Sequence, residues 1–342
     1  MSAVPGWLWP GIALAALLAC GLLYQAWGTA RDRRRYPPPG IRRNGIHLHL
    51  RGSTGPWVVL EAGIAASSAS WRPVADLLAS GYRVLAYDRP GFGWSDARRT
   101  PRDIPVLVEE LREALDLAGV GEPVLFIGHS FGGLLGRHFC ARYPERVAGL
   151  VLADPLLPEE WHPASPEQLH RLGRGVMLSR RGAVLARLGV VRLALELLTG
   201  GSTRIPKLMA RASSSAKGAA ITNRLVGEVR KLPADLWPVI GSHWCLPRSF
   251  ATMAAYLDRL SANCALAPDD EALAGKPLVV ISAATAEPHV REGHAALAAR
   301  STLGRHLVAE DSGHWIQLDR PDVIAASLKE VTMGMNPRKE SA

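Results

Sequence analysis

One serine and one histidine stand in sequence settings that suit nucleophilic catalysis. Ser130 is the central residue of the segment GHSFG at residues 128–132, and Gly133 follows. A serine at this spacing can occupy a sharp turn between a strand and a helix, because the glycines leave room in a crowded turn. Such a turn lifts the hydroxyl above the sheet and points the first N–H groups of the helix at a developing oxyanion. We therefore predict that Ser130 is a nucleophile.

The predicted general base is His314, within the segment DSGHW at residues 311–315. This segment follows an apolar run and precedes a predicted helix, so its histidine is expected on a loop at the end of a strand. From such a loop a histidine can take the serine proton and later return it to the leaving group. We interpret the rival histidines His129, His289 and His294 as surface or core residues.

Seven short apolar runs are predicted as the strands that position these side chains. They cover residues 45–52, 57–63, 82–88, 123–128, 148–154, 277–283 and 306–311. Helical segments separate most of the runs, which is typical of an α/β fold with a mostly parallel central sheet and helices on both faces. The GHSFG segment directly follows the run at 123–128 and precedes a helical stretch, which is the context that this motif requires.

The alternation of strands and helices stops between Pro155 and Ala274. This part of the sequence reads as helical, which predicts a lid at residues 155–274 inserted into a core formed by residues 37–154 and 275–342. Trp161, Trp237 and Trp244 are candidates to line the substrate site, with ordinary packing as the alternative.

One lid segment, Leu178–Leu198, is amphipathic, with Arg180, Arg187 and Arg192 spaced among aliphatic residues. We interpret it as a lid helix with an outward basic face, because surface helices generally have such a pattern. The alternative is a surface helix that enters a membrane with its apolar side.

Residues 7–27 carry no charged side chain. As a helix, about 20 residues at about 1.5 Å per residue cross the roughly 30 Å hydrocarbon core of a bilayer. Trp7, Trp9, Tyr24 and Trp27 stand at the two ends, where aromatic rings prefer the membrane interface. We predict that residues 1–36 form a retained, single-pass transmembrane anchor with a basic flank. A cleaved signal peptide and a buried core helix are the alternatives.

Arginines at 31 and 33–35 follow the predicted span. By the positive-inside rule they place the catalytic domain in the cytoplasm. The segment YPPPG at residues 36–40 is predicted to be a stiff spacer. Removal of residues 1–36 is therefore expected to release an active, soluble domain.

The net charge of +9 on 342 residues is scattered along the chain, without a zinc-finger or RNP-type pattern. We expect no nucleic-acid partner and interpret the charge as a solvated basic surface or an attraction to anionic lipid. The four cysteines have no metal-binding spacing. Buried thiols are expected, and a disulfide between Cys245 and Cys264 is the alternative.

Three motifs together resemble the α/β-hydrolase superfamily in type, order and spacing. They are GHSFGG at 128–133, DRPGFGWS at 88–95 and SGH at 312–314. The resemblance covers about residues 41–335, and the chain looks most similar to lid-bearing bacterial serine esterase-like hydrolases with an N-terminal membrane span. It implies the α/β-hydrolase fold and a catalytic triad that contains Ser130 and His314.

The acid of this triad departs from the pattern that the resemblance implies. The family usually carries the acid after the strand that follows the lid, and by alignment that position falls on Ala286. Asp154, at the end of the strand after the predicted turn helix, is therefore the expected acid, and Glu287 is the alternative. Asp311 is too close in sequence to His314 to reach its Nδ1. A Ser–His dyad or another acid remains open.

The oxyanion hole is implied by the same resemblance. One donor is the backbone N–H of Phe131, the residue after the nucleophile. The second is assigned to the N–H of Ile64, and Gly63 and Ala65 are the alternatives. Asp88, in the segment DRPGFG, is interpreted as a structural residue that pins its loop through backbone N–H groups.

The resemblance implies hydrolysis of a carboxylic ester or related acyl bond through an acyl-enzyme. A small lipophilic acyl substrate is expected, with no metal or organic cofactor, and no particular oligomeric state is indicated. A C–C bond hydrolase, an acyltransferase and a cofactor-free peroxidase are alternatives on the same fold. A non-catalytic binding protein is the alternative of a different class. Epoxide hydrolases and haloalkane dehalogenases are disfavoured, because those relatives carry Asp where this chain has Ser130.

Overall fold

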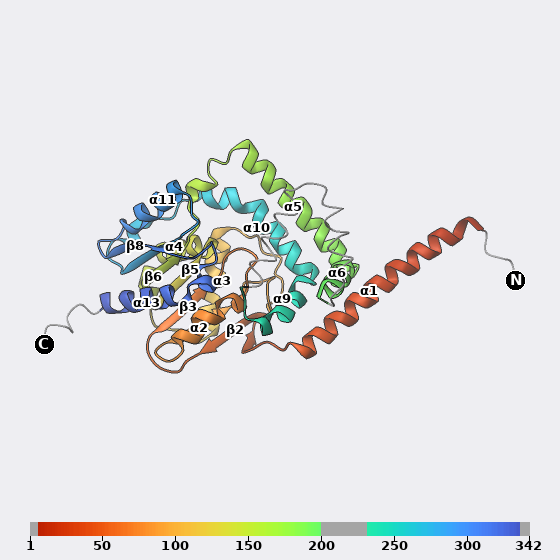
Figure 1. The fold of residues 1–342 in the computed structure, drawn as a ribbon, viewed down its shortest axis with the longest axis horizontal. Coiled ribbons are helices and arrows are strands. Elements are labelled where there is room, and N and C mark those ends of the chain that lie inside the picture. The colour runs from red at the N-terminus through yellow and green to blue at the C-terminus, as the bar shows by residue number, and fades with distance from the viewer. Residues whose placement is uncertain (1–5, 200–230, 336–342) are drawn as a thin grey trace. The chain divides into compact units, whose positions relative to one another are not determined.

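The computed structural model describes residues 6–199 and 231–335, which form two compact units (Figure 1). Of the described residues, 38–175 and 255–335 form one unit, which we call the sheet unit. The other unit, here the helical unit, contains residues 6–37, 176–199 and 231–254.

The sheet unit contains an eight-stranded sheet with the order β1-β2-β4-β3-β5-β6-β7-β8. The strands are β1 (Ile41–Arg43), β2 (Ile46–Arg51), β3 (Trp57–Glu61), β4 (Arg83–Tyr87), β5 (Val124–His129), β6 (Val147–Ala153), β7 (Leu278–Ala283) and β8 (Gly304–Ala309). The strands β3 to β8 run parallel to one another, whereas at one edge β2 pairs antiparallel with both β4 and β1. The predicted mostly parallel sheet is confirmed, and β1 is an additional strand.

Helices cover both faces of this sheet. Within residues 6–199 and 231–335 the α-helices are α1 (Trp9–Arg35), α2 (Arg72–Leu78), α3 (Ile104–Leu117), α4 (Phe131–Arg142), α5 (Pro166–Arg187), α6 (Val190–Thr199), α9 (Trp237–Trp244), α10 (Pro247–Ala265), α11 (Pro288–Ala298), α12 (Ile316–Asp319) and α13 (Pro321–Gly334). On one face α2 packs against α13, and on the other α3 packs against α4.

The alternation of side chains along β5 explains the two helical layers. Leu125 and Ile127 belong to the core beneath α2 and α13. Phe126 points to the opposite face, where its ring leaves room only for a glycine at position 136 of α4. Because both sides of the strand are buried, its sequence is a continuous apolar run rather than an alternating one.

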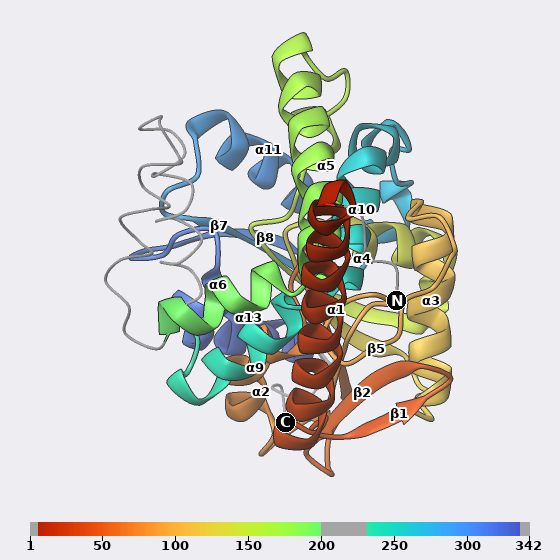
Figure 2. The ribbon, with the colours of Figure 1, turned by 90° about the vertical axis from the view of Figure 1, so that its right-hand side faces the viewer.

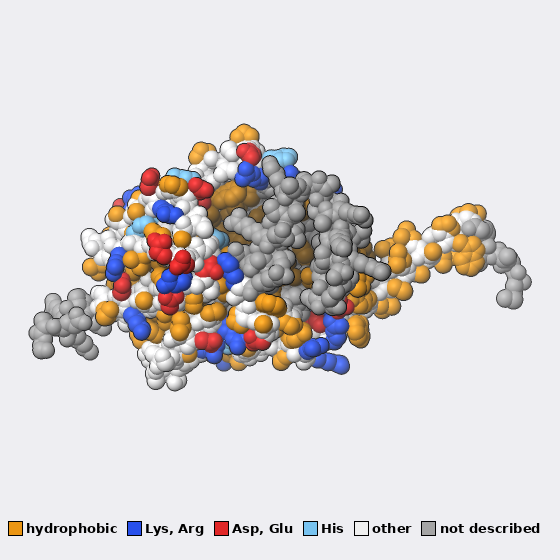
Figure 3. Space-filling view, viewed as in Figure 1, with side chains coloured by type: hydrophobic (Ala, Val, Ile, Leu, Met, Phe, Trp, Pro, Cys, Tyr) orange, Lys and Arg blue, Asp and Glu red, His pale blue; other side chains and the backbone are white. Residues whose placement is uncertain are grey.

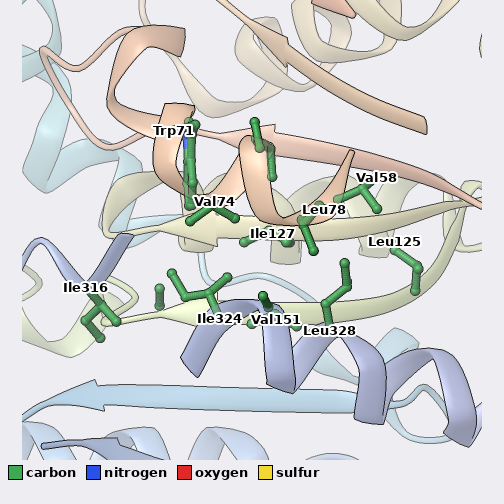
Figure 4. Packing of buried hydrophobic residues seen from close by; sticks show 14 of the residues in the cluster. Val58, Trp71, Val74, Leu78, Leu125, Ile127, Val151, Ile316, Ile324 and Leu328 are labelled. Atoms are coloured by element: carbon green, nitrogen blue, oxygen red, sulfur yellow. The ribbon is translucent and has the colours of Figure 1, made fainter. Parts of the chain in front are cut away.

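The core on the α2–α13 face is built from strands and helices together (Figure 4). Its members include Val58, Trp71, Val74, Leu78, Leu125, Ile127, Val151, Ile316, Ile324 and Leu328. Each of these side chains is at most 1% exposed. Burying an aliphatic side chain of this size contributes about 1.5–3 kcal/mol, so this layer fixes the strand ends that carry the site.

In the helical unit, α1 packs against α6, and α6 packs against α9 (Figure 2). The predicted continuous helix at Leu178–Leu198 is instead broken between α5 and α6, where Gly189 adopts a positive φ of 72°. Arg180 and Arg187 are exposed, as expected. Arg192 is not part of an outward basic face, because its side chain is only 1% exposed and pairs with Asp32 of α1.

Candidate active site

Ser130 lies between the last residue of β5 and the first residue of α4. Its backbone has φ 55° and ψ −122°, a conformation that L-residues seldom adopt outside functional sites. The turn is held by hydrogen bonds from the Ser130 N–H to the Ala153 carbonyl (3.1 Å) and from the Gly133 N–H to the Ser130 carbonyl (2.9 Å). The predicted strand–turn–helix context of Ser130 is therefore present.

The glycines of the motif are required by close backbone approaches. A Cβ atom on Gly128 would lie 2.6 Å from the Gly132 carbonyl oxygen, and one on Gly132 would lie 2.7 Å from the Ala62 carbonyl oxygen. A Cβ on Gly133 would lie 2.6 Å from the Pro155 Cβ. Any larger residue at these positions would push the Ser130 turn away from the strands beside it.

Asp154 directly follows β6, the neighbour of β5, and contacts His314 in the loop after β8. The distance from Asp154 Oδ2 to His314 Nδ1 is 2.6 Å. The other carboxylate oxygen, Oδ1, accepts a hydrogen bond from the Ala283 N–H at 2.9 Å. The expected contact between Asp154 and the imidazole is thus confirmed. Glu287 is an exposed residue at the start of α11.

The surroundings of Asp154 favour its ionised form. Burial alone would raise the pKa of this carboxyl group, but the hydrogen bond and charge of His314, with the Ala283 N–H, lower it below its usual value. An ionised carboxylate at Nδ1 keeps the proton of a neutral imidazole on that nitrogen, which leaves Nε2 free to accept a proton.

His129, the residue before Ser130, holds the loop of His314. Its Nε2 lies 2.7 Å from the His314 carbonyl oxygen, and its Nδ1 lies 3.2 Å from Gln317 Nε2. Burial, together with the nearby His314, lowers the pKa of His129 to about 3. A neutral His129 that donates from Nε2 and accepts at Nδ1 satisfies both contacts. His129 therefore ties the turn of Ser130 to the loop of His314.

His294 supports the segment that follows Asp154. Its Nε2 lies 2.8 Å from the Pro155 carbonyl oxygen, and its Nδ1 lies 2.8 Å from the Ser282 hydroxyl. Burial lowers the pKa of His294, so the neutral form is favoured. The sequence alone predicts that His129 and His294 are surface or core residues. Both are indeed buried, and their contacts give them a positioning role that no local pattern signals.

The turn after β3 lies against Ser130. A Cβ atom on Gly63 would lie 3.4 Å from the Ser130 Cβ. The Gly63 carbonyl accepts a hydrogen bond from Arg89. Since a trans peptide unit is planar, the N–H of Ile64 points away from that carbonyl, and Arg89 therefore also sets the direction of the Ile64 N–H. The Phe131 N–H lies in the first turn of α4, where helical N–H groups have no partner within the helix.

Arg89 is itself held by a buried acid. Its Nε lies 3.5 Å from Glu61 Oε1, and the two side chains are 2% and 1% exposed. Tyr87 donates a hydrogen bond to the same carboxyl group. Burial raises the pKa of Glu61 to about 7, although the Arg89 charge and the Tyr87 hydroxyl oppose this rise. No sequence motif indicates this contact between Glu61 and Arg89.

Asp88 has the structural role expected from the sequence. Its carboxylate accepts hydrogen bonds from the Ser68 N–H at 2.7 Å and the Trp94 N–H at 2.9 Å. His47 Nδ1 lies 2.9 Å from the same carboxylate. These contacts lower the pKa of Asp88 although its burial raises it, so the residue is an ionised anchor for the loop.

Among the described residues, the Ser130 hydroxyl and the His314 imidazole form no direct hydrogen bond, and the contact of His129 with the His314 carbonyl joins the two segments that carry them. Catalytic hydrogen bonds of this kind often tighten only when substrate binds. In the same residues, no group of three or more His, Cys, Asp or Glu side chains is placed to hold a metal ion. Of the predicted lid tryptophans, Trp244 packs edge-on against Phe250, and Trp237 is 41% exposed.

A serine on a strained strand-to-helix turn, with an Asp–His pair at the ends of neighbouring strands of a mostly parallel sheet, defines a hydrolase of the α/β type. The family model described as the alpha/beta hydrolase fold matches residues 56–321, and the chain belongs to this family.

Curated relatives match a shorter part of the chain. The chain is 33% identical to the uncharacterized protein YqjL of Bacillus subtilis over 123 residues. This aligned part covers 33% of this chain and 49% of YqjL. It is 37% identical to epoxide hydrolase 3 of Siraitia grosvenorii over 131 residues, and this aligned part covers 37% of this chain and 40% of that enzyme. The chain thus matches less than half the length of each relative.

Solved structures share the fold over most of their length. A thermophilic esterase from Thermogutta terrifontis is 20% identical with a TM-score of 0.56, over 85% of this chain and 93% of the esterase. The enol-lactonase from Burkholderia xenovorans LB400 is 19% identical with a TM-score of 0.53, over 84% of this chain and 96% of the lactonase. At these identities the likeness shows the fold alone.

Proposed function

We propose that the chain is a serine hydrolase that cleaves a carboxylic ester or related acyl bond through an acyl-enzyme. The observation that carries the proposal is the combination of Ser130 in its strained turn with the 2.6 Å contact between Asp154 and His314. A strained serine at a helix N-terminus and an imidazole oriented by a carboxylate are the parts that acyl transfer requires.

In the proposed reaction the Ser130 hydroxyl attacks the carbonyl carbon while His314 Nε2 takes its proton. The N–H groups of Phe131 and Ile64 stabilise the negative charge that develops on the carbonyl oxygen. The imidazolium then returns the proton to the departing alcohol, and the acyl group stays on Ser130. Water repeats the sequence on the acyl-enzyme, which releases the carboxylic acid and restores the serine. Each oxyanion donor typically contributes about 3–4 kcal/mol to transition-state stabilisation.

The nucleophile argues against epoxide opening, although epoxide hydrolases are among the relatives. A serine oxygen that opened an epoxide would become an ether, which has no carbonyl group for water to attack. The enzyme would then be alkylated after one turnover. Ser130 is suited to acyl bonds, whose serine esters water can cleave.

We further propose that α1 anchors the enzyme in a membrane and that the acyl substrate is lipophilic. The most apolar part of α1 has a mean hydropathy of 1.6, and only 11% of it is buried. The exposed arginines Arg33–Arg35 follow this helix, which supports a cytoplasmic catalytic domain. Protease digestion of a C-terminal tag in intact cells would contradict this orientation.

Ser130→Ala tests the proposed activity directly. The variant should lose both turnover of p-nitrophenyl esters and labelling by a fluorophosphonate, because no other side chain supplies the nucleophile. Ser80→Ala is the matched control, since it removes the same hydroxyl from an exposed position. Full ester turnover by a folded Ser130→Ala protein would refute the mechanism. A folded wild-type protein without label or turnover would favour the non-catalytic binding protein.

A further inference from the structure

Only the first part of α1 is free of contacts with the rest of the helical unit. Residues 7–27 span about 30 Å at about 1.5 Å per residue, which matches the hydrocarbon core. Contacts with the rest of the helical unit begin at Gly21, where a Cβ atom would lie 2.5 Å from the Leu188 carbonyl oxygen. The free residues 7–20 cover only about 21 Å by the same rise. A protein contact thus begins about 9 Å before the helix reaches Trp27.

The two sides of α1 differ over these last turns. Gly21, Gln25 and Gly28 face α6 and its neighbours, and the Gln25 amide donates to the Cys245 carbonyl at 2.8 Å. On the other side Leu23 is 70% exposed and Trp27 is 59% exposed. The apolar outer surface of α1 therefore continues alongside the protein contact (Figure 3). Such a surface suits lipid on one side and protein on the other.

The partner of α1 at this level has an exposed apolar surface of its own. We define the α5–α6 corner as residues 184–193, which join the end of α5 to the first turn of α6. Four of its apolar side chains are exposed: Val184 (60%), Leu185 (44%), Val190 (47%) and Leu193 (50%). Arg187, within the corner, is exposed as well, and an arginine can keep its charge at the lipid head groups while its stem lies in an apolar layer.

We propose that the α5–α6 corner inserts into the bilayer leaflet through which α1 leaves the membrane. The proposal rests on the proposed membrane span of α1. Its depth follows from the contact at Gly21, about 9 Å before Trp27 along the helix axis. Helices that lie in a membrane interface bury their apolar face by about 5–10 Å, so the two depths agree. The corner also contains Arg192, whose buried charge is paired with the carboxylate of Asp32 inside the helical unit and is therefore not presented to lipid.

Single-cysteine labelling of the full chain can test this insertion. The four cysteines are free, and Cys20 is exposed, whereas the other three are buried. A polarity-sensitive fluorophore on Cys20 therefore reports on α1. The same fluorophore on Val184→Cys, in a Cys20→Ser background, reports on the α5–α6 corner. Leu303→Cys in that background is the control, because Leu303 is 53% exposed in the sheet unit. Vesicles of phosphatidylcholine and phosphatidylglycerol carry spin-labelled lipids as quenchers, and iodide quenches from the water.

If the corner inserts, spin-labelled lipids should quench the labels at positions 20 and 184 several-fold more strongly than the label at 303. Iodide should quench most strongly at 303. Quenching at 20 but not at 184 would overturn the insertion and leave the span intact. Protection of position 184 from both quenchers would overturn it as well, and would indicate cover by protein, such as a second copy of the chain. Equal lipid quenching at 184 and 303 would remove the special role of the corner. No lipid quenching at 20 would refute the span, and the insertion with it, without touching the Ser130 chemistry.

Discussion

The carboxylate closest to the His314 imidazole comes from the end of β6, and Asp154→Asn tests its role. The amide would remove the charge that stabilises the imidazolium and could present the wrong tautomer of His314. The corresponding change in a serine protease costs about 10⁴-fold in kcat. We expect a loss of several orders of magnitude in ester turnover with the fold retained, measured by steady-state kinetics and circular dichroism.

Glu287→Gln is the matched control for this change, because it removes the same charge from an exposed position at the start of α11. Exposed charges act weakly through water, so this variant should keep nearly full activity. A severe loss in Glu287→Gln with little effect in Asp154→Asn would assign the acid to the other strand end.

Glu61→Gln should make stability less dependent on pH. Burial raises the pKa of Glu61 from 4.5 to about 7. The folded protein therefore holds this proton more tightly than the unfolded chain, so the contribution is complete at low pH and is lost as the pH rises through about 7. A shift of this size corresponds to about 3 kcal/mol. Urea unfolding at pH 5 and pH 8 should show that the wild type loses up to this amount relative to Glu61→Gln. Parallel pH profiles would contradict the shift.

At the residue scale, the sequence predicts the positions that belong to a local motif or to a strand end. Ser130 has its glycines, His314 follows the last apolar run, and Asp154 is the acidic residue at the end of its own run. Arg89 and His129 lie within the motifs DRPGFGWS and GHSFGG, but these motifs do not indicate their contacts. Their roles depend on which backbone atoms lie nearby, the carbonyls of residues 63 and 314, and only the folded chain brings those atoms together.

At the scale of elements, the seven predicted runs match β2 to β8 to within about two residues. For the central parallel strands the reason is that a strand buried on both faces is a continuous apolar run. The strand β1 was missed, since Ile41–Arg43 is short, exposed and mostly charged. The sequence feature that indicates β1 is the pair Asn44–Gly45, which favours a tight hairpin turn. Both residues have a positive φ and form the turn into β2. The break between α5 and α6 has a similar signal in Gly189.

Packing of α1 on α6 depends on a buried ion pair, and Asp32→Asn should weaken it. Arg192 Nη1 lies 2.5 Å from Asp32 Oδ2, and Arg192 Nε donates to Gln25 at 3.0 Å. Without the carboxylate, a guanidinium group that is 1% exposed remains uncompensated, at a cost of about 3–5 kcal/mol. Thermal unfolding in detergent and faster hydrogen exchange in α6 would measure the loss.

Two further variants separate pairing from packing at this contact. Arg34→Gln removes a charge from an exposed position of α1 and should leave the thermal midpoint unchanged. Asp32→Leu combined with Arg192→Met replaces both partners by apolar groups and should recover most of the lost stability. Failure of the double variant to recover would mean that the ion pair matters for its geometry rather than for its charge balance.

At the scale of the whole molecule, α1 has two parts that the sequence presents as one: an exposed apolar first half, and a second half that packs inside the helical unit. From the sequence alone, residues 1–36 are expected to form an anchor that a spacer separates from the catalytic domain. In the structure all of α1 belongs to the helical unit, and its second half contributes Gln25 and Asp32 to the interior of that unit. This assignment could not be read from hydropathy, because the partners of these residues lie more than 150 positions away in the chain.

The place of truncation should therefore decide how a soluble form behaves. Deletion of residues 1–20 removes most of the free apolar part of α1 and keeps Gly21, Gln25 and Asp32 against their partners. Deletion of residues 1–36 also removes the carboxylate of Asp32, which leaves Arg192 buried without its counter-charge and uncovers the side of α6 that packs on α1. We expect the shorter deletion to be monodisperse in size-exclusion chromatography and to keep full fluorophosphonate labelling, and the longer one to unfold at a lower temperature or aggregate. Equal stability of the two proteins would show that α1 acts as an anchor alone, as the sequence first indicated.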